Sequence, residues 1–186
     1  VMTEKYDVVV TNPPYMGTRN MDKRLKDYLN SEYKEVKTDL FSSFIVRCQE
    51  YSSYGGHLGF MCPFVWMFIK SYEWLRKQII SDAQITTLVQ LEYSGFDGAT
   101  VPICTFTLRN ANASDVGTYI RLSDFRGSEN QGPKTLEAIE DTNADYRFTA
   151  RGRHYANIPG SPIAYWASRN VIRAFEEGTR LGEIAP

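Results

Sequence analysis

The stretch YDVVVTNPPY at residues 6–15 decides the fold expected for this chain. Three consecutive valines follow Asp7, and β-branched residues favour strands. The run ends at a Pro-Pro pair, because proline cannot donate a hydrogen bond to a strand ladder. The pattern predicts a buried parallel strand over residues 6–11, whose carboxyl end opens into the loop Asn12-Pro13-Pro14-Tyr15.

Helical and strand patterns alternate along the rest of the chain, which indicates the α/β class. Asp39 stands where a helix cap is expected, ahead of an amphipathic helix that Gly55-Gly56 would end. Helices are predicted over 21–33, 40–54, 72–81, 133–141 and 163–176, strands over 57–62, 85–91, 101–108 and 118–122, and a flexible loop over 128–133. The strands over 85–91 and 101–108 are expected to pair antiparallel, whereas 146–162 shows no clear periodicity.

Length and composition indicate an ordinary globular chain with a sizeable core, since 42% of its 186 residues are hydrophobic and 23% are charged. A formal net charge of -1 argues against a strongly basic nucleic-acid clamp, so any DNA contact must be local or shared. Two basic clusters, one at Lys23, Arg24 and Lys26 and one at Arg147, Arg151, Arg153 and His154, fit solvated faces better than DNA sites.

The three cysteines, Cys48, Cys62 and Cys104, are widely spaced in apolar sequence. An odd, scattered set fits reduced core thiols better than a disulfide framework or a zinc site, and indicates a cytoplasmic protein. No apolar run of about eighteen residues and no secretory leader is present, so no membrane association is expected.

The loop Asn12-Pro13-Pro14-Tyr15 has the groups needed to activate an exocyclic amine. Such an amine is a poor nucleophile because its lone pair is delocalised into the ring. The amide oxygen of Asn12 and the backbone carbonyl of Pro13 can each accept a hydrogen from it, and Tyr15 can stack on the base. An ordinary turn is the competing interpretation, but ligands bind at the carboxyl ends of strands in open α/β sheets.

These residues resemble the catalytic motif of the amino-methyltransferases that use S-adenosylmethionine, in particular the branch that methylates N6 of adenine in DNA. The resemblance implies the C-terminal half of a Rossmann-like methyltransferase sheet, with parallel strands, a final antiparallel hairpin and a C-terminal extension. Residues 38–44, TDLFSSF, are similar to the next motif, which makes Asp39 and Phe44 the cofactor-side candidates. Phe44 fits a core position equally well.

Phe96 matches the aromatic residue that sandwiches the extruded base against Tyr15, and a buried loop anchor is its alternative.

The tail at residues 158–168, IPGSPIAYWAS, resembles a segment of the PglX-like methyltransferases of bacterial phage-exclusion systems. In that family it precedes the target-recognition region. We therefore expect residues 1–126 to form the C-terminal half of a catalytic domain, and residues 127–186 to lead toward a recognition domain. The apolar content of the tail also fits simple packing.

A complete enzyme of this type needs a Gly-rich loop and an acidic residue to bind the cofactor, and neither precedes Val8. We therefore expect an excised piece of a longer protein, which by itself binds S-adenosylmethionine weakly or not at all and does not methylate DNA. The whole protein is expected to use S-adenosylmethionine without a metal, in the bacterial cytoplasm. Its expected partners are double-stranded DNA with a flipped adenine and other defence-system subunits.

Three other functions are compatible with the same loop. Enzymes that methylate a glutamine amide in release factors and enzymes that methylate N2 of guanine in RNA carry the same four residues. The third is a catalytically silent DNA-binding scaffold, against which the intact Asn12 and Tyr15 argue.

Overall fold

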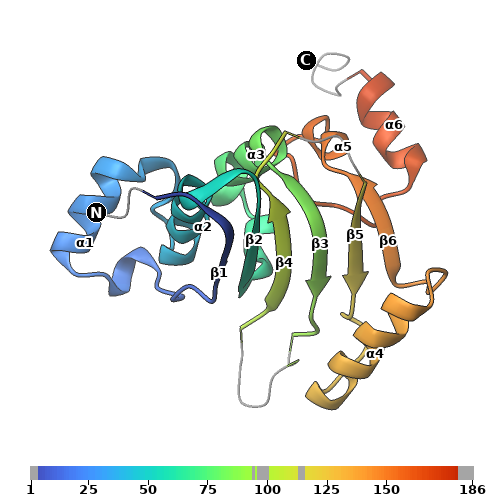
Figure 1. Cartoon of the computed structure of the whole chain (residues 1–186). Helices are drawn as coiled ribbons and strands as arrows, with labels where there is room; N and C mark the ends of the chain where they lie inside the picture. Colours follow the sequence, from blue (N-terminus) through green and yellow to red (C-terminus); the bar gives the residue numbers. More distant parts are fainter. Residues whose placement is uncertain (1–3, 94, 96–100, 113–115, 180–186) are drawn as a thin grey trace.

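The structure, a computed structural model, describes residues 4–93, 95, 101–112 and 116–179. These residues form a six-stranded sheet in the order β1-β2-β4-β3-β5-β6, with helices packed against it (Figure 1). The strands are β1 (Tyr6–Thr11), β2 (Ser52–Pro63), β3 (Gln84–Gln90), β4 (Ile103–Arg109), β5 (Val116–Arg121) and β6 (Arg147–Arg151). The α-helices are α1 (Lys23–Glu32), α2 (Leu40–Tyr51), α3 (Glu73–Asp82), α4 (Ser128–Glu140), α5 (Arg153–Ala156) and α6 (Arg169–Glu177). Short 3₁₀ turns are η1 (Thr18–Asn20), η2 (Lys34–Val36), η3 (Phe64–Met67) and η4 (Lys70–Tyr72).

Strand directions place four strand ends on one edge of the sheet. β1 is parallel to β2, and β3 is parallel to β5. β4 runs antiparallel between β2 and β3, as expected for the predicted 85–91 and 101–108 strands, and β6 is antiparallel to β5. β1, β2, β3 and β5 therefore point the same way, and the loop after β1 lies on the edge formed by their carboxyl ends.

The main core lies between one face of the sheet and helices α2 and α3. Alternate strand residues such as Leu58, Phe60 and Phe106 point into it, opposite Ile45 and Leu75 of the helices. A smaller cluster on the opposite face joins Ile103 and Ile120 to Ala138 of α4. The three cysteines are free and buried, in agreement with the expected reduced core thiols.

The expected burial of β1 is not found among the described residues. There β1 pairs only with β2, and Val8 and Val10 are 63% and 75% exposed. Only Val9, on the other face, packs against the main core. The β-branched run correctly predicted the strand and its parallel pairing, but side-chain type does not reveal whether anything covers its second face.

Two predicted boundaries differ in the structure because tertiary contacts override local signals. Residues 128–133, expected as a flexible loop, form the first turns of α4, where Gln131 donates to the carbonyls of Phe125 and Gly127 and accepts from the Glu92 amide. Helix α2 ends at Tyr51, and Gly55, at φ +80°, lies within β2 where its register with β1 shifts.

The C-terminal part also departs from the prediction. Residues 147–151, which lack clear periodicity, form β6. The final helix, predicted over 163–176, begins six residues later and spans Arg169–Glu177. Ile163 and Tyr165, placed in that helix from the sequence, are instead buried in the main core. Tyr165 stacks on Tyr119 of β5 with ring centroids 4.8 Å apart, and its hydroxyl donates to Gln90 at 2.7 Å.

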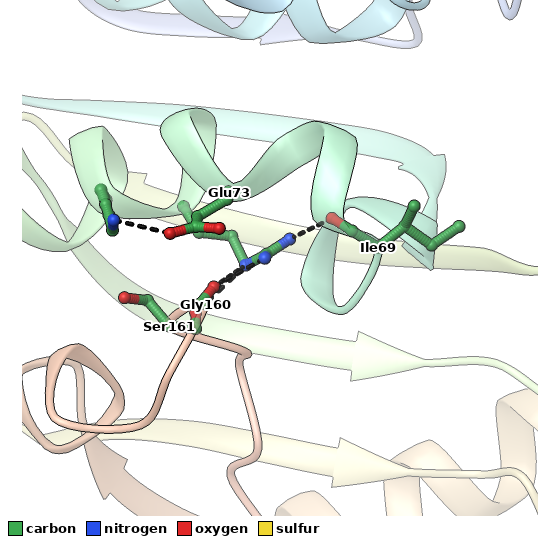
Figure 2. A network of polar contacts seen from close by, with 6 residues as sticks. Ile69, Glu73, Gly160 and Ser161 are labelled. Carbon is green, nitrogen blue, oxygen red and sulfur yellow. Dashed lines mark hydrogen bonds and ion pairs between the residues drawn. The ribbon is translucent and has the colours of Figure 1, made fainter. Parts of the chain in front are cut away.

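Arg76 of α3 fastens this C-terminal segment to the core. Arg76 is only 1% exposed, and its guanidinium donates to the carbonyls of Trp66 and Ile69 at 2.8 Å and to those of Gly160 and Ser161. Figure 2 shows the Ile69 and Gly160 carbonyls meeting this group from two sides. Ser161 has a φ of +49°, a conformation that costs a non-glycine residue roughly 1–2 kcal/mol. The buried cation compensates for the strained turn by bonding to its carbonyls.

Replacing Arg76 tests this role. Arg76→Met leaves four buried or partly buried carbonyls with fewer donors, so we expect the free energy of unfolding to fall by about 2–4 kcal/mol. Urea unfolding followed by tryptophan fluorescence measures it. Lys77→Met is the matched control, because Lys77 forms only an exposed ion pair with Glu73, worth about 0.5 kcal/mol or less. Equal losses in the two variants would rule out the fastening role.

Candidate active site

The loop Asn12-Pro13-Pro14-Tyr15 follows β1 directly, at the carboxyl edge of the sheet. Pro13 is buried, while the Asn12 and Tyr15 side chains are both exposed to a ligand. Proline fixes φ and has no donor, so the buried Pro13 makes the loop rigid without leaving an unsatisfied N–H. The loop therefore presents a fixed amide and a fixed ring at the edge where open α/β sheets bind ligands.

The hydroxyl of Tyr15 ties the loop together. It lies 2.9 Å from Oδ1 of Asn12 and 3.1 Å from the backbone carbonyl oxygen of Met61 on β2, and both atoms are acceptors. A hydroxyl has one proton, so it donates to one of these oxygens at a time. Burial, with smaller contributions from Cys62 and Cys104, raises the pKa of Tyr15 to about 12. The hydroxyl therefore stays protonated, and remains a donor, at neutral pH.

A hollow of about 310 Å³ adjoins Asn12 on the face of the sheet opposite the main core. A row of small side chains crosses the sheet at its floor and leaves space above them. Val10 pairs with Gly59, Gly59 with Thr107 and Thr107 with Thr87. A Cβ on Gly59 would lie 3.4 Å from the side chain of Val10, so glycine keeps this floor open.

A second hollow, of about 360 Å³, opens between α1, α2 and the end of β1. Phe44 lines it and is 37% exposed, so its side chain is available to a ligand. Tyr28, Tyr51 and Arg47 add aromatic and cationic surface to the same wall. An aromatic hollow of this size suits a flat heterocycle.

Asp39 does not line either hollow. It is the N-cap of α2, as the sequence predicts, and its Oδ1 accepts from the amides of Phe41 at 3.3 Å and Met16 at 2.9 Å. The structure thus brings Asn12, Tyr15 and Asp39 together through backbone and side-chain bonds, with Phe44 one helical turn farther along α2. Phe96 lies outside the described residues.

Sequence reasoning missed one part of this site, the carbonyl of Met61. Every residue carries such an acceptor, so no residue type marks it, and only the pairing of β1 with β2 brings it to Tyr15. The sequence did predict that Asp39 caps a helix. It did not reveal that Asp39 also accepts from the Met16 amide, because Met16 lies 23 positions earlier.

The chain has the fold of class I S-adenosylmethionine-dependent methyltransferases from restriction-modification systems. A type I restriction-modification methyltransferase subunit from Streptococcus thermophilus matches it with a TM-score of 0.64, over 87% of this chain and 38% of that subunit, at 16% identity. Residues 1–96 match the model of the Eco57I restriction-modification methylases, and the chain belongs to that family.

Two curated relatives match nearly the whole chain. The adenine-specific methyltransferase PglX of Lacticaseibacillus casei (strain Zhang) is 31% identical over 179 residues, which cover 94% of this chain. The adenine-specific methyltransferase BrxX of Escherichia coli O9:H4 (strain HS) is 29% identical over 189 residues, covering all of it. The chain spans 15% of the length of each relative. The resemblance to PglX-like methyltransferases, first recognised in the motifs, is confirmed.

The described part of the chain has no cluster of metal ligands. Among those residues, no three His, Cys, Asp or Glu side chains come together in a way that could hold a metal ion. None of the helices described is long and apolar enough to cross a membrane.

Proposed function

We propose that the protein containing this chain transfers a methyl group from S-adenosylmethionine to N6 of adenine in DNA, within a bacterial restriction-modification or phage-defence system. One observation carries the proposal. The Asn12 amide oxygen stands beside a hollow at the carboxyl edge of the sheet, held in place by the Tyr15 hydroxyl. The names of the two curated relatives, both adenine-specific methyltransferases, support adenine over a glutamine amide or guanine N2.

Asn12 and Pro13 act on the amine of the base. When Oδ1 of Asn12 and the carbonyl of Pro13 each accept one amine hydrogen, the nitrogen moves toward tetrahedral geometry and its lone pair is localised. Pro14, the exposed residue between Pro13 and Tyr15, restricts the loop further. Catalysis then comes from positioning and electrostatics, without a covalent intermediate.

The two acceptors near the Tyr15 hydroxyl allow an exchange of partners. The hydroxyl can donate to the Met61 carbonyl when an incoming amine bonds to Oδ1 of Asn12. Oδ1 can also accept from both donors at once, because an amide oxygen has two lone pairs. The ring of Tyr15 remains free to stack on the base.

The aromatic hollow beside Phe44 fits the adenine end of the cofactor. Phe44, Tyr28 and Tyr51 would hold the ring by stacking and apolar contact, and Thr11 joins this hollow to the catalytic loop. S-adenosylmethionine, when bound, supplies an electrophilic methyl group. Phe44 and Asp39 remain the two cofactor-side predictions from the sequence.

The DNA substrate would present its target adenine flipped out of the duplex. A base inside a duplex cannot reach the Asn12 loop, so the target must leave the stack, and Tyr15 with Phe96 would enclose it. A net charge of -1 means that most phosphate contacts come from other parts of the protein or from partner subunits. The division into a catalytic part at 1–126 and an extension at 127–186 belongs to the same proposal.

The first test is Asn12→Ala in the full-length protein. Loss of one oriented acceptor at the reacting amine should lower methylation by roughly 10²–10³-fold. N6-methyladenine in genomic DNA, measured by mass spectrometry in cells expressing each variant, is the readout. Asn20→Ala, at an exposed asparagine in η1, is the matched control and should behave as wild type. Equal N6-methyladenine in the Asn12→Ala and wild-type strains would refute the proposal.

The second test separates the ring of Tyr15 from its hydroxyl. Tyr15→Ala removes stacking worth about 1–3 kcal/mol, so kcat/KM for an oligonucleotide should fall by roughly 5–150-fold. Tyr15→Phe keeps the ring and should cost less than about tenfold, because the removed hydrogen bond is worth about 0.5–1.5 kcal/mol. Steady-state methylation kinetics with purified full-length protein measure both. The stacking role is wrong if Tyr15→Phe loses as much as Tyr15→Ala.

A further inference from the structure

The segment after the catalytic loop lies antiparallel against the segment that leads into α2. The Leu40 amide donates to the Met16 carbonyl at 3.0 Å, and the Thr18 amide donates to the Thr38 carbonyl at 3.2 Å. Gly17 and Asp39 form the β-bridge between these two bonds. The Thr18 hydroxyl lies within hydrogen-bond distance of the carbonyls of Lys37 and Thr38. We call residues 16–18 and 37–40 the clasp.

Met16 follows Tyr15 directly in the chain. Among the described residues, Asp39 is the only one in the clasp whose side chain hydrogen-bonds to Met16. Its Oδ1 accepts from Met16 N at 2.9 Å and from Phe41 N at 3.3 Å, so one oxygen caps α2 and holds the end of the catalytic loop. A Cβ on Gly17 would lie 3.7 Å from Oδ2 of Asp39, an ordinary contact distance, so these two residues lie side by side in the clasp.

The carboxylate joins the loop to a rigid element. The first turn of α2 packs Phe41 into the main core, where it is 1% exposed. Partial burial raises the pKa of Asp39, and the backbone amides of Met16, Phe41 and Leu40 offset only part of this rise. A residue bonded to this oxygen is thereby fixed relative to the sheet.

Two other helix caps show that a side chain can cap a helix without also bonding to a distant segment. Asp22 caps α1 by accepting from Leu25 N at 2.7 Å, and Ser168 caps α6 by accepting from Val171 N at 3.4 Å. Each holds only its own helix. Asp39 caps α2 and also holds Met16, which lies 23 residues earlier.

From these contacts we infer that Asp39 is a positioning residue for methyl transfer, which aligns the Tyr15 ring and the Asn12 amide by holding Met16. The inference rests on the proposed function for its catalytic consequence. It assigns Asp39 a role through the backbone of the loop, in place of the direct cofactor contact expected from the sequence. The group that does this work is an acceptor oxygen, so its negative charge is secondary.

Kinetics of the full-length protein distinguish a positioning role of Asp39 from a direct contact between Asp39 and the cofactor. Asp39→Asn keeps an oxygen in the position of Oδ1, so kcat should stay within about threefold of wild type. Asp39→Ala removes it, and kcat should fall on the order of 10–100-fold, with KM for S-adenosylmethionine changed less than about threefold. Asp22→Ala loses a cap of the same kind on α1 and should keep the wild-type kcat. Thermal unfolding of Asp39→Ala and Asp22→Ala checks that any difference in kcat is not a difference in folding.

The mobility of the loop can be measured without measuring activity. Hydrogen–deuterium exchange of the peptide spanning residues 13–20, read by mass spectrometry, should be faster in Asp39→Ala and unchanged in Asp39→Asn and Asp22→Ala. If the wild-type protein methylates no adenine, the proposed function fails while this exchange still reports on the clasp.

Three results would overturn the inference. The first is a wild-type kcat in Asp39→Ala. The second is a raised KM for S-adenosylmethionine in both Asp39→Asn and Asp39→Ala, which would assign the charge to the cofactor. The third is unchanged exchange of the 13–20 peptide in Asp39→Ala.

Discussion

Strand β4 runs between β2 and β3 and hydrogen-bonds to both, from the Ile103 end to Arg109. Because it is antiparallel to each neighbour, β2 and β3 point the same way, and β1 and β5 follow them through parallel pairing. The carboxyl ends of these four strands therefore meet one edge. The loop that begins at Asn12 depends on this arrangement, since it places Asn12 beside β2 and the hollow over Gly59 and Thr107.

The candidate site achieves rigidity through bonds to backbone atoms. The Tyr15 hydroxyl reaches the Met61 carbonyl on β2, and the Met16 amide reaches Asp39 at the start of α2. One end of the loop continues a paired strand, and the other is attached to a helix packed in the core. Such a loop can present an amide and a ring in one geometry, which positional catalysis on a weakly nucleophilic amine requires.

The same use of backbone carbonyls holds the C-terminal segment. Arg76 has no carboxylate within salt-bridge distance among the described residues, yet it is buried, because four carbonyl oxygens replace the water that would solvate it. Burial lowers the pKa of Arg76, and the nearby Glu73 partly offsets this. Tyr165, stacked on Tyr119, completes the attachment.

Local chemistry in the sequence was enough to predict several parts of this protein. The β-branched run and the Pro-Pro pair marked β1 and the loop after it, Asp39 marked the start of α2, and the residues between 85 and 108 marked an antiparallel pair. These signals act within a few residues, so they can be recognised without knowing what lies across the fold. The methyltransferase family was predicted separately, from the resemblance of the Asn12 loop and the motifs after it to those of a known family.

Only the tertiary structure decided which groups meet over long distances. Among the described residues, it left Val8 and Val10 exposed, turned residues 147–151 into strand β6, and buried Tyr165 in the core. It also supplied the acceptors and donors on which the site relies, namely the Met61 carbonyl and the Met16 amide. Every residue carries these backbone groups, so side-chain identity cannot mark the ones that matter, and only the folding of the chain selects them.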